Sequence, residues 1–211
     1  MTFQATSPLA SIAELVLLLV VGGSTIWAYR SRQNDKPHSV LLGTWSLSSL
    51  FLALAVIAAW LPEGSTDLET LKRLGINLGI YAGMPMLAVA VYALGKRLFW
   101  SAAGWGRLLL GFFALFELNR QLGYGEEYTN VLGAASVIGV LSGALFLSVA
   151  RARVLSAAAA VSVAAALAFS GSAALPVPAY PVAATLLAAM GIALLTTAVR
   201  LEISLLNQPS Q

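Results

Sequence analysis

Cysteine is absent from this chain of 211 residues, and histidine occurs once, as His38. Without cysteine there is no disulfide, no thiolate metal site, no thioether-linked haem and no cysteine nucleophile. A single histidine cannot build the multi-histidine centre of a membrane zinc hydrolase or a haem protein. We therefore expect no metal and no other cofactor, and we assign no catalytic residue.

Charged residues are also scarce, at 10% of the chain, whereas soluble domains carry about 25%. Hydrophobic residues make up 59% and form seven runs close to the ~20 residues that cross a bilayer. Period-2 alternation is absent, which argues against a membrane β-barrel. The sequence predicts an all-α polytopic membrane protein, a single seven-helix domain over residues 1–211. The helices are expected at about 9–29, 39–61, 70–94, 99–122, 128–149, 154–171 and 181–201.

The net charge of +3 does not indicate nucleic-acid binding, because the basic residues are scattered through short connections. The first apolar run has no basic segment before it and is long enough to span, so we expect an uncleaved helix and not a signal peptide. The expected partner is the lipid bilayer. No loop is long enough for a soluble domain, so any function must lie in the bundle, at its faces or in a partner.

The distribution of lysine and arginine predicts the orientation. With the N-terminus outside and the C-terminus inside, three basic residues lie outside and nine inside. The outer three are Lys72, Arg73 and Arg120; the inner nine are Arg30, Arg32, Lys36, Lys96, Arg97, Arg107, Arg151, Arg153 and Arg200. The outer connections also hold most acids, namely Glu63, Asp67, Glu69, Glu126 and Glu127. We expect a multi-pass protein of the cell membrane, specifically a bacterial inner membrane.

The third hydrophobic segment, at about 66–94, carries glycine at every fourth position, as Gly75, Gly79 and Gly83. Such a ridge lets another helix approach closely, and we interpret it as a packing seam. Asn77 and Tyr81 lie on nearly the opposite side of the same helix.

That segment carries two further signals, one at its start and one at Pro85. Thr66 followed by Glu69 has capping-box spacing and predicts the start of the helix. Pro85 lies inside the helix and predicts a kink or a break.

Polar and ionisable residues inside a membrane are costly, so each is a functional candidate. Under the predicted topology, five of them fall in the outer half of the bundle: Glu14, Asn77, Tyr81, Glu117 and Arg120. If they face inward, they line one pocket for a small molecule or a lipid.

Each of these residues also has a purely structural interpretation. Glu117 and Arg120 are three apart and can pair locally. Glu14 can reach water from one turn below the surface. Asn77 can bond a neighbouring helix, and Tyr81 can pack with its hydroxyl satisfied. Likewise, His38 is expected in a solvated basic loop.

The serine cluster of the second segment also needs no functional role. Ser46, Ser48 and Ser49 can each bond the carbonyl one turn back in their own helix.

Three functions remain open. The first is a sensor or accessory subunit that binds a small molecule or lipid, with small-residue faces that allow a homo-oligomer or a membrane partner. The second is a membrane enzyme acting on a lipid through Glu14 or Glu117, since burial raises a carboxylate pKa toward that of a general acid. The third is a small-solute transporter, against which no internal repeat is visible.

Overall fold

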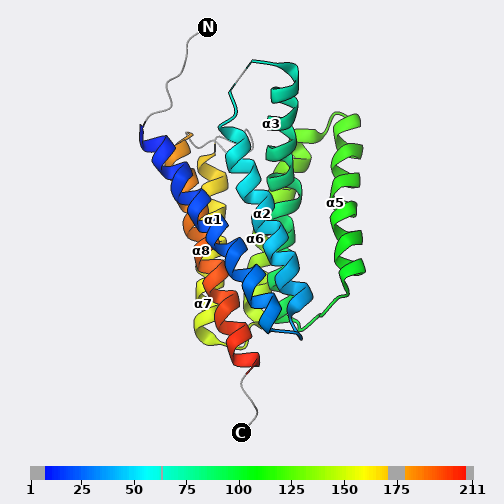
Figure 1. Cartoon of the computed structure of the whole chain (residues 1–211), viewed down its shortest axis with the longest axis vertical. Helices are drawn as coiled ribbons and strands as arrows, with labels where there is room; N and C mark the ends of the chain where they lie inside the picture. The colour runs from blue at the N-terminus through cyan, green and yellow to red at the C-terminus, as the bar shows by residue number, and fades with distance from the viewer. Residues whose placement is uncertain (1–7, 63, 171–178, 208–211) are drawn as a thin grey trace.

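The computed structural model describes residues 8–62, 64–170 and 179–207, so Glu63 and most of the 171–180 connection lie outside it. The described residues form seven helices that run roughly parallel or antiparallel, with α1 beginning and α8 ending at opposite ends of the bundle (Figure 1). The third helix has three parts, α3, the π-helical turn η1 and α4. The elements are α1 Pro8–Asn34, α2 Ser39–Ala59, α3 Thr66–Leu78, η1 Gly79–Gly83, α4 Met84–Gly95, α5 Ala102–Gln121, α6 Gly125–Phe146, α7 Ala150–Phe169 and α8 Pro181–Leu206.

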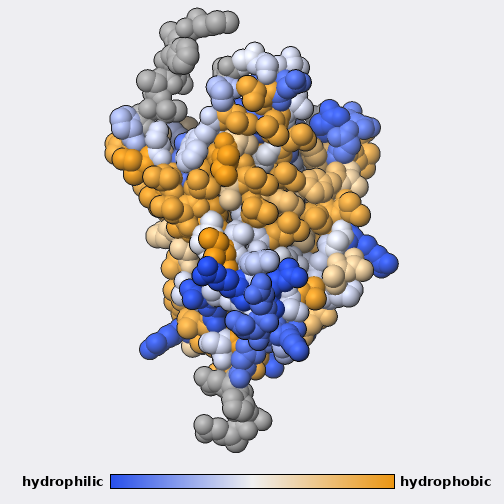
Figure 2. Space-filling view, in the orientation of Figure 1, coloured by the Kyte–Doolittle hydropathy of each residue, from blue (hydrophilic) through white to orange (hydrophobic). Residues whose placement is uncertain are grey.

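Six helices in the described residues are long and apolar enough to cross a membrane: α1, α2, the continuous 66–95 helix, α6, α7 and α8. Apolar side chains form a broad belt around the middle of the bundle, and hydrophilic residues gather at its lower end (Figure 2). The chain is an integral multi-pass membrane protein. α5 is not among the six; it carries Arg107, Glu117 and Arg120 within 20 residues and lies along one edge of the bundle.

The predicted end of α1 was wrong, whereas the predicted start of the third helix at Thr66 is confirmed. α1 continues to Asn34, so Arg30 and Arg32 extend from its last turns and not from a loop. The helix that begins at Thr66 is capped by Ser65, whose hydroxyl accepts a hydrogen bond from Leu68 N at 3.3 Å. Ser65 is in an extended conformation, as an N-cap residue must be, whereas Thr66 is already helical.

The predicted interruption at Pro85 takes the form of a π turn just before it. Proline lacks an N–H and its ring collides with the carbonyl four residues back, here that of Tyr81. η1 widens the helix over Gly79–Gly83, and Met84 N donates to Gly79 O, five residues back. The helix therefore passes Pro85 without ending, since single π turns relieve such conflicts within helices.

The glycine ridge of this helix lies directly against α2. A Cβ atom added at Gly79 would stand 2.6 Å from Cβ of Ala55, and one at Gly83 would stand 3.0 Å from Cγ of Leu52. Gly75 faces Ala58 at a similarly close approach. No side chain fits between the two helices, so the ridge sets their separation.

A second close contact joins α4 to α6. A Cβ atom at Gly143 would lie 2.7 Å from the backbone nitrogen of Tyr92, and one at Gly95 would lie 2.6 Å from the carbonyl oxygen of Gly143. Gly139, one turn earlier, faces Ala88. Backbone here packs on backbone, which leaves no flexible side chain to move aside.

Hydroxyl groups join α1, α2 and α8 at the centre of the bundle. Ser24 Oγ lies 3.1 Å from Ser49 Oγ and 3.0 Å from Thr196 Oγ1, and it accepts a hydrogen bond from Trp45 Nε1 at 2.9 Å. All four residues are buried. We call Ser24, Trp45, Ser49 and Thr196 the hydroxyl cluster.

Every hydrogen-bond donor of the hydroxyl cluster has an acceptor. Thr196 donates its hydroxyl hydrogen to Ile192 O, so Ser24 must be the donor toward Thr196. The lone pairs of Ser24 then accept from Trp45 and from Ser49, which satisfies every donor of the cluster. The expectation that all three α2 serines bond their own helix holds for Ser48 alone, since Ser49 bonds Ser24 and Ser46 donates to Thr25 O.

We predict that Gly143→Ala lowers the stability of the bundle by about 1–3 kcal/mol, the usual range for overpacking. The new methyl group would meet the Tyr92 backbone, which cannot move without shifting α4. Thermal unfolding in detergent, followed by tryptophan fluorescence, measures the change. Gly22→Ala is the control, because nothing lies within 4 Å of a Cβ there. Equal melting temperatures for the two variants would contradict the backbone contact.

We predict that Ser24→Ala also lowers stability by about 1–3 kcal/mol, because it leaves the buried Trp45 N–H without an acceptor. The matched variant is Ser48→Ala, equally buried, whose hydroxyl bonds only the Thr44 carbonyl of its own helix. The same unfolding assay compares them. If Ser48→Ala costs as much as Ser24→Ala, the cluster contributes nothing beyond local bonds.

Candidate functional site

The five residues predicted for an outer pocket fall into separate groups. Glu14, on α1, accepts a hydrogen bond at 2.5 Å from Trp60 Nε1, just past the end of α2. Glu117 and Arg120, on α5, form an exposed ion pair at 2.6 Å, and Gln121 also donates to Glu117. Each carboxylate thus has a partner close to its own position.

Tyr81 lies at the contact of the 66–95 helix with α5 and α6. Its ring stacks on Phe116 with centroids 3.8 Å apart, and its hydroxyl is 2.8 Å from Thr129 Oγ1. Asn77, one turn away on the same helix, is half-buried and forms no side-chain hydrogen bond within the described part of the chain. The structure brings Tyr81 next to Phe116, the neighbour of Glu117, whereas Glu14 belongs to the α1–α2 side.

The opposite end of the bundle holds a polar cluster that the sequence did not indicate. His38 Nδ1 lies 2.9 Å from Asp35 Oδ1, and Asn207 Nδ2, just past α8, donates to Asp35 Oδ2 at 2.8 Å. His38 is only 5% exposed and meets the Phe99 ring edge-on, so the expectation of a solvated histidine was wrong. These contacts tie the α1–α2 connection to the end of α8.

The charge state of Asp35 follows from its partners. Burial would raise the pKa of this carboxyl group, but hydrogen bonds from Asn207 and His38, with the electrostatic effect of the nearby His38, outweigh it and lower the pKa below 3.8. Asp35 therefore stays ionised at neutral pH.

Glu202 is a second buried acid at this end, 2% exposed, which sequence reasoning passed over. Its carboxylate accepts hydrogen bonds from Ser148 N at 2.8 Å and Val149 N at 3.0 Å, at the start of α7. The first turn of α7 has no side-chain cap of its own, and its exposed N–H groups and dipole favour a negative charge. The sequence held a signal for this role of Glu202, because a helix start without a capping residue needs a hydrogen-bond acceptor from elsewhere in the chain.

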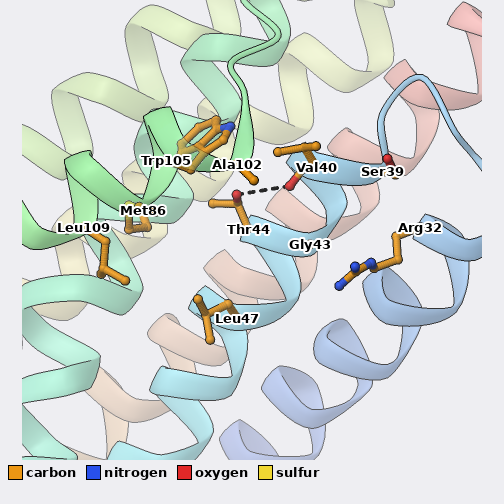
Figure 3. A pocket seen from close by; sticks show the side chains of 11 residues that line it. Arg32, Ser39, Val40, Gly43, Thr44, Leu47, Met86, Ala102, Trp105 and Leu109 are labelled. Carbon is orange, nitrogen blue, oxygen red and sulfur yellow. Dashed lines mark hydrogen bonds between the residues drawn. The ribbon is translucent and has the colours of Figure 1, made fainter.

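A half-open cleft of about 300 Å³ lies between α2 and α5 at the end where Arg32 and Ser39 are placed (Figure 3). We call it the α2–α5 cleft. Arg32, Ser39 and Thr44 supply its polar groups, and apolar side chains line the rest. The remaining lining residues are Val40, Gly43, Leu47, Met86, Ala102, Trp105, Gly106 and Leu109.

Two aromatic side chains anchor α5 to the bundle, one near each end of the helix. Trp105 is buried at 3% exposure near the start of α5, and Phe116 stacks on Tyr81 near its end. Between them, α5 contributes only small and aliphatic side chains, such as Gly106 and Leu109, to the lining. The burial of Trp105 makes it an anchor for α5.

The cleft offers one cation and two hydroxyl groups as binding groups. Within residues 8–62, 64–170 and 179–207, no three His, Cys, Asp or Glu side chains gather as a metal site would require. Comparison with protein-family models, curated proteins and solved structures found no match for this chain. A functional assignment therefore depends on the geometry of the cleft.

We predict that the Asp35–His38–Asn207 contacts stabilise the bundle at neutral pH and weaken in acid. The pKa of Asp35 is lowered in the folded state, so its contribution is present above its unfolded pKa of about 3.9 and is lost as the pH falls through the folded value. Asp35→Asn should cost about 1–3 kcal/mol at pH 7, and its difference from the unmodified protein should shrink below pH 4.

Urea unfolding between pH 3 and pH 7 measures this difference. Glu126→Gln is the control, since Glu126 is exposed and belongs to no ion pair of the described residues. A gap between Asp35→Asn and the unmodified protein that stays constant across the range would contradict the ionised carboxylate.

Proposed function

We propose that this protein is a membrane-embedded binding protein, a sensor or accessory subunit, that holds an amphipathic molecule of the bilayer in the α2–α5 cleft. The observation that carries the proposal is the shape of the cleft: about 300 Å³, polar where Arg32 and Ser39 lie, apolar toward Leu47 and Leu109. Ligand sites are concave and mostly apolar with a few placed polar groups. The proposal moves the main site from the expected outer half to the opposite end of the bundle.

Topology supports a ligand that arrives from the membrane. We propose that α5 crosses the bilayer as a seventh span beside the six apolar ones, because it runs along the side of the bundle with them (Figure 1). We also propose an outer N-terminus and an inner C-terminus, in a bacterial inner membrane, from the excess of basic residues at the end where α1 and α4 finish. The cleft would then face the inner leaflet.

A second proposed binding site is formed by residues of the predicted outer pocket. Asn77 favours it, because a half-buried amide without a hydrogen bond in the described residues is available to a ligand. The enzymatic alternative has less support, since Glu14 is bonded to Trp60 and Glu117 to Arg120. Transport has no observation in its favour beyond the buried hydroxyl cluster, which is internally satisfied.

We predict that the purified protein retains about one lipid per chain after detergent exchange, and that Leu47→Trp removes it. Indole at this position fills the apolar depth of the cleft. Native mass spectrometry of the detergent-released protein counts the retained lipid. Leu50→Trp is the matched control: Leu50 lies on the same helix, is 43% exposed against 40% for Leu47, and does not line the cleft.

Two outcomes would refute the proposed site. One is an unmodified protein that retains no lipid. The other is equal retention by Leu47→Trp and Leu50→Trp, which would place the lipid elsewhere on the belt. Because the chain has no cysteine, a single cysteine at either position also permits site-specific labelling without background.

A further inference from the structure

We infer that the occupant of the α2–α5 cleft is a glycerophospholipid whose phosphate is bound by Arg32. The inference rests on the proposed function and adds the ligand class. It depends on three observations: the path of the Arg32 side chain, the absence of a competing acid, and the depth over which the lining changes from polar to apolar.

The Arg32 side chain extends from the end of α1 toward Gly43 of α2 (Figure 3). A Cβ atom at Gly43 would lie 3.5 Å from Arg32 Nη1, in ordinary van der Waals contact, so the guanidinium lies directly over Gly43 and a longer side chain there would meet it. A cation carried by α1 thus reaches a cleft formed by α2 and α5. Guanidinium presents a fork of N–H donors that matches phosphate oxygens.

The acid nearest Arg32 in sequence, Asp35, is already bound by Asn207 and His38. Among the described residues, Arg32 forms no ion pair and no hydrogen bond to another side chain. A guanidinium with unused donors at a lipid-facing cleft is complementary to an anionic head group.

The dimensions fit a lipid and not a free anion. Ser39 begins α2 and Leu47 lies eight residues further, so the lining descends roughly 12 Å along the helix. Ser39 and Thr44 donate their hydroxyl hydrogens to the carbonyls of Lys36 and Val40, which leaves their oxygens as acceptors for head-group hydroxyls. A phosphate at Arg32, a glycerol beside the hydroxyls and an acyl chain along Leu47 occupy the cleft in that order.

The test titrates phosphatidylglycerol, and separately diacylglycerol, into delipidated protein and measures bound lipid by native mass spectrometry. We expect phosphatidylglycerol to bind more tightly than diacylglycerol. Arg32→Gln should weaken phosphatidylglycerol binding by about tenfold, the loss of one charge-assisted hydrogen bond, and leave diacylglycerol unchanged. Gly43→Leu, which retains the arginine but displaces it from the cleft, should have the same effect.

The control is Arg30→Gln, which removes an equally exposed cation from the same helix end without touching the cleft. Equal weakening by Arg30→Gln would show a general surface charge effect and overturn the Arg32 site. Equal affinity for the two lipids would also overturn it. If Leu47→Trp still abolishes binding in either case, the cleft keeps its lipid and only the head-group assignment fails; if Leu47→Trp has no effect, the proposed function itself fails.

Discussion

Inside a bilayer, a polar group can be satisfied only by protein, and this constraint organises the bundle around Ser24. Its hydroxyl connects α1 to Trp45 and Ser49 on α2 and to Thr196 on α8, which is distant in sequence. Each donor has one acceptor, so an altered register of α1 would leave a buried N–H or O–H unpaired. Hydrocarbon packing alone is non-directional; these bonds specify which faces of the three helices meet.

The sequence predicted the helices well because their signal is local. Runs of ~20 apolar residues, glycines four apart and a proline within a helix each act through the segment that carries them. Where the structure differed, the cause lay across helices: Ser49 bonds α1 and not its own backbone, and His38 is buried with its ring edge-on to Phe99, in the connection between α4 and α5. No spacing within one segment reports such a partner.

The same reasoning explains why the sequence grouped residues of different helices into one predicted pocket. Depth along a helix can be read from a sequence, so Glu14, Tyr81 and Glu117 were grouped by level. Whether they face one another depends on helix rotation, and the structure gives Glu14 and Glu117 separate partners. The α2–α5 cleft could not be anticipated, because α1, α2, α4 and α5 all contribute to its lining and no single segment reports how they pack.

The π turn also explains how glycines spaced four residues apart keep contact with one neighbouring helix. Four residues of α-helix overshoot a full turn by roughly 40°, so glycines four apart gradually rotate away from a neighbour. A π turn needs more residues per turn, so the same four-residue step within it falls short of a full turn. The step from Gly75 to Gly79 lies in α3, and the step from Gly79 to Gly83 spans η1. The two deviations from a full turn have opposite signs. The wide turn at Pro85 therefore offsets the rotation along α3 and keeps all three glycines against α2.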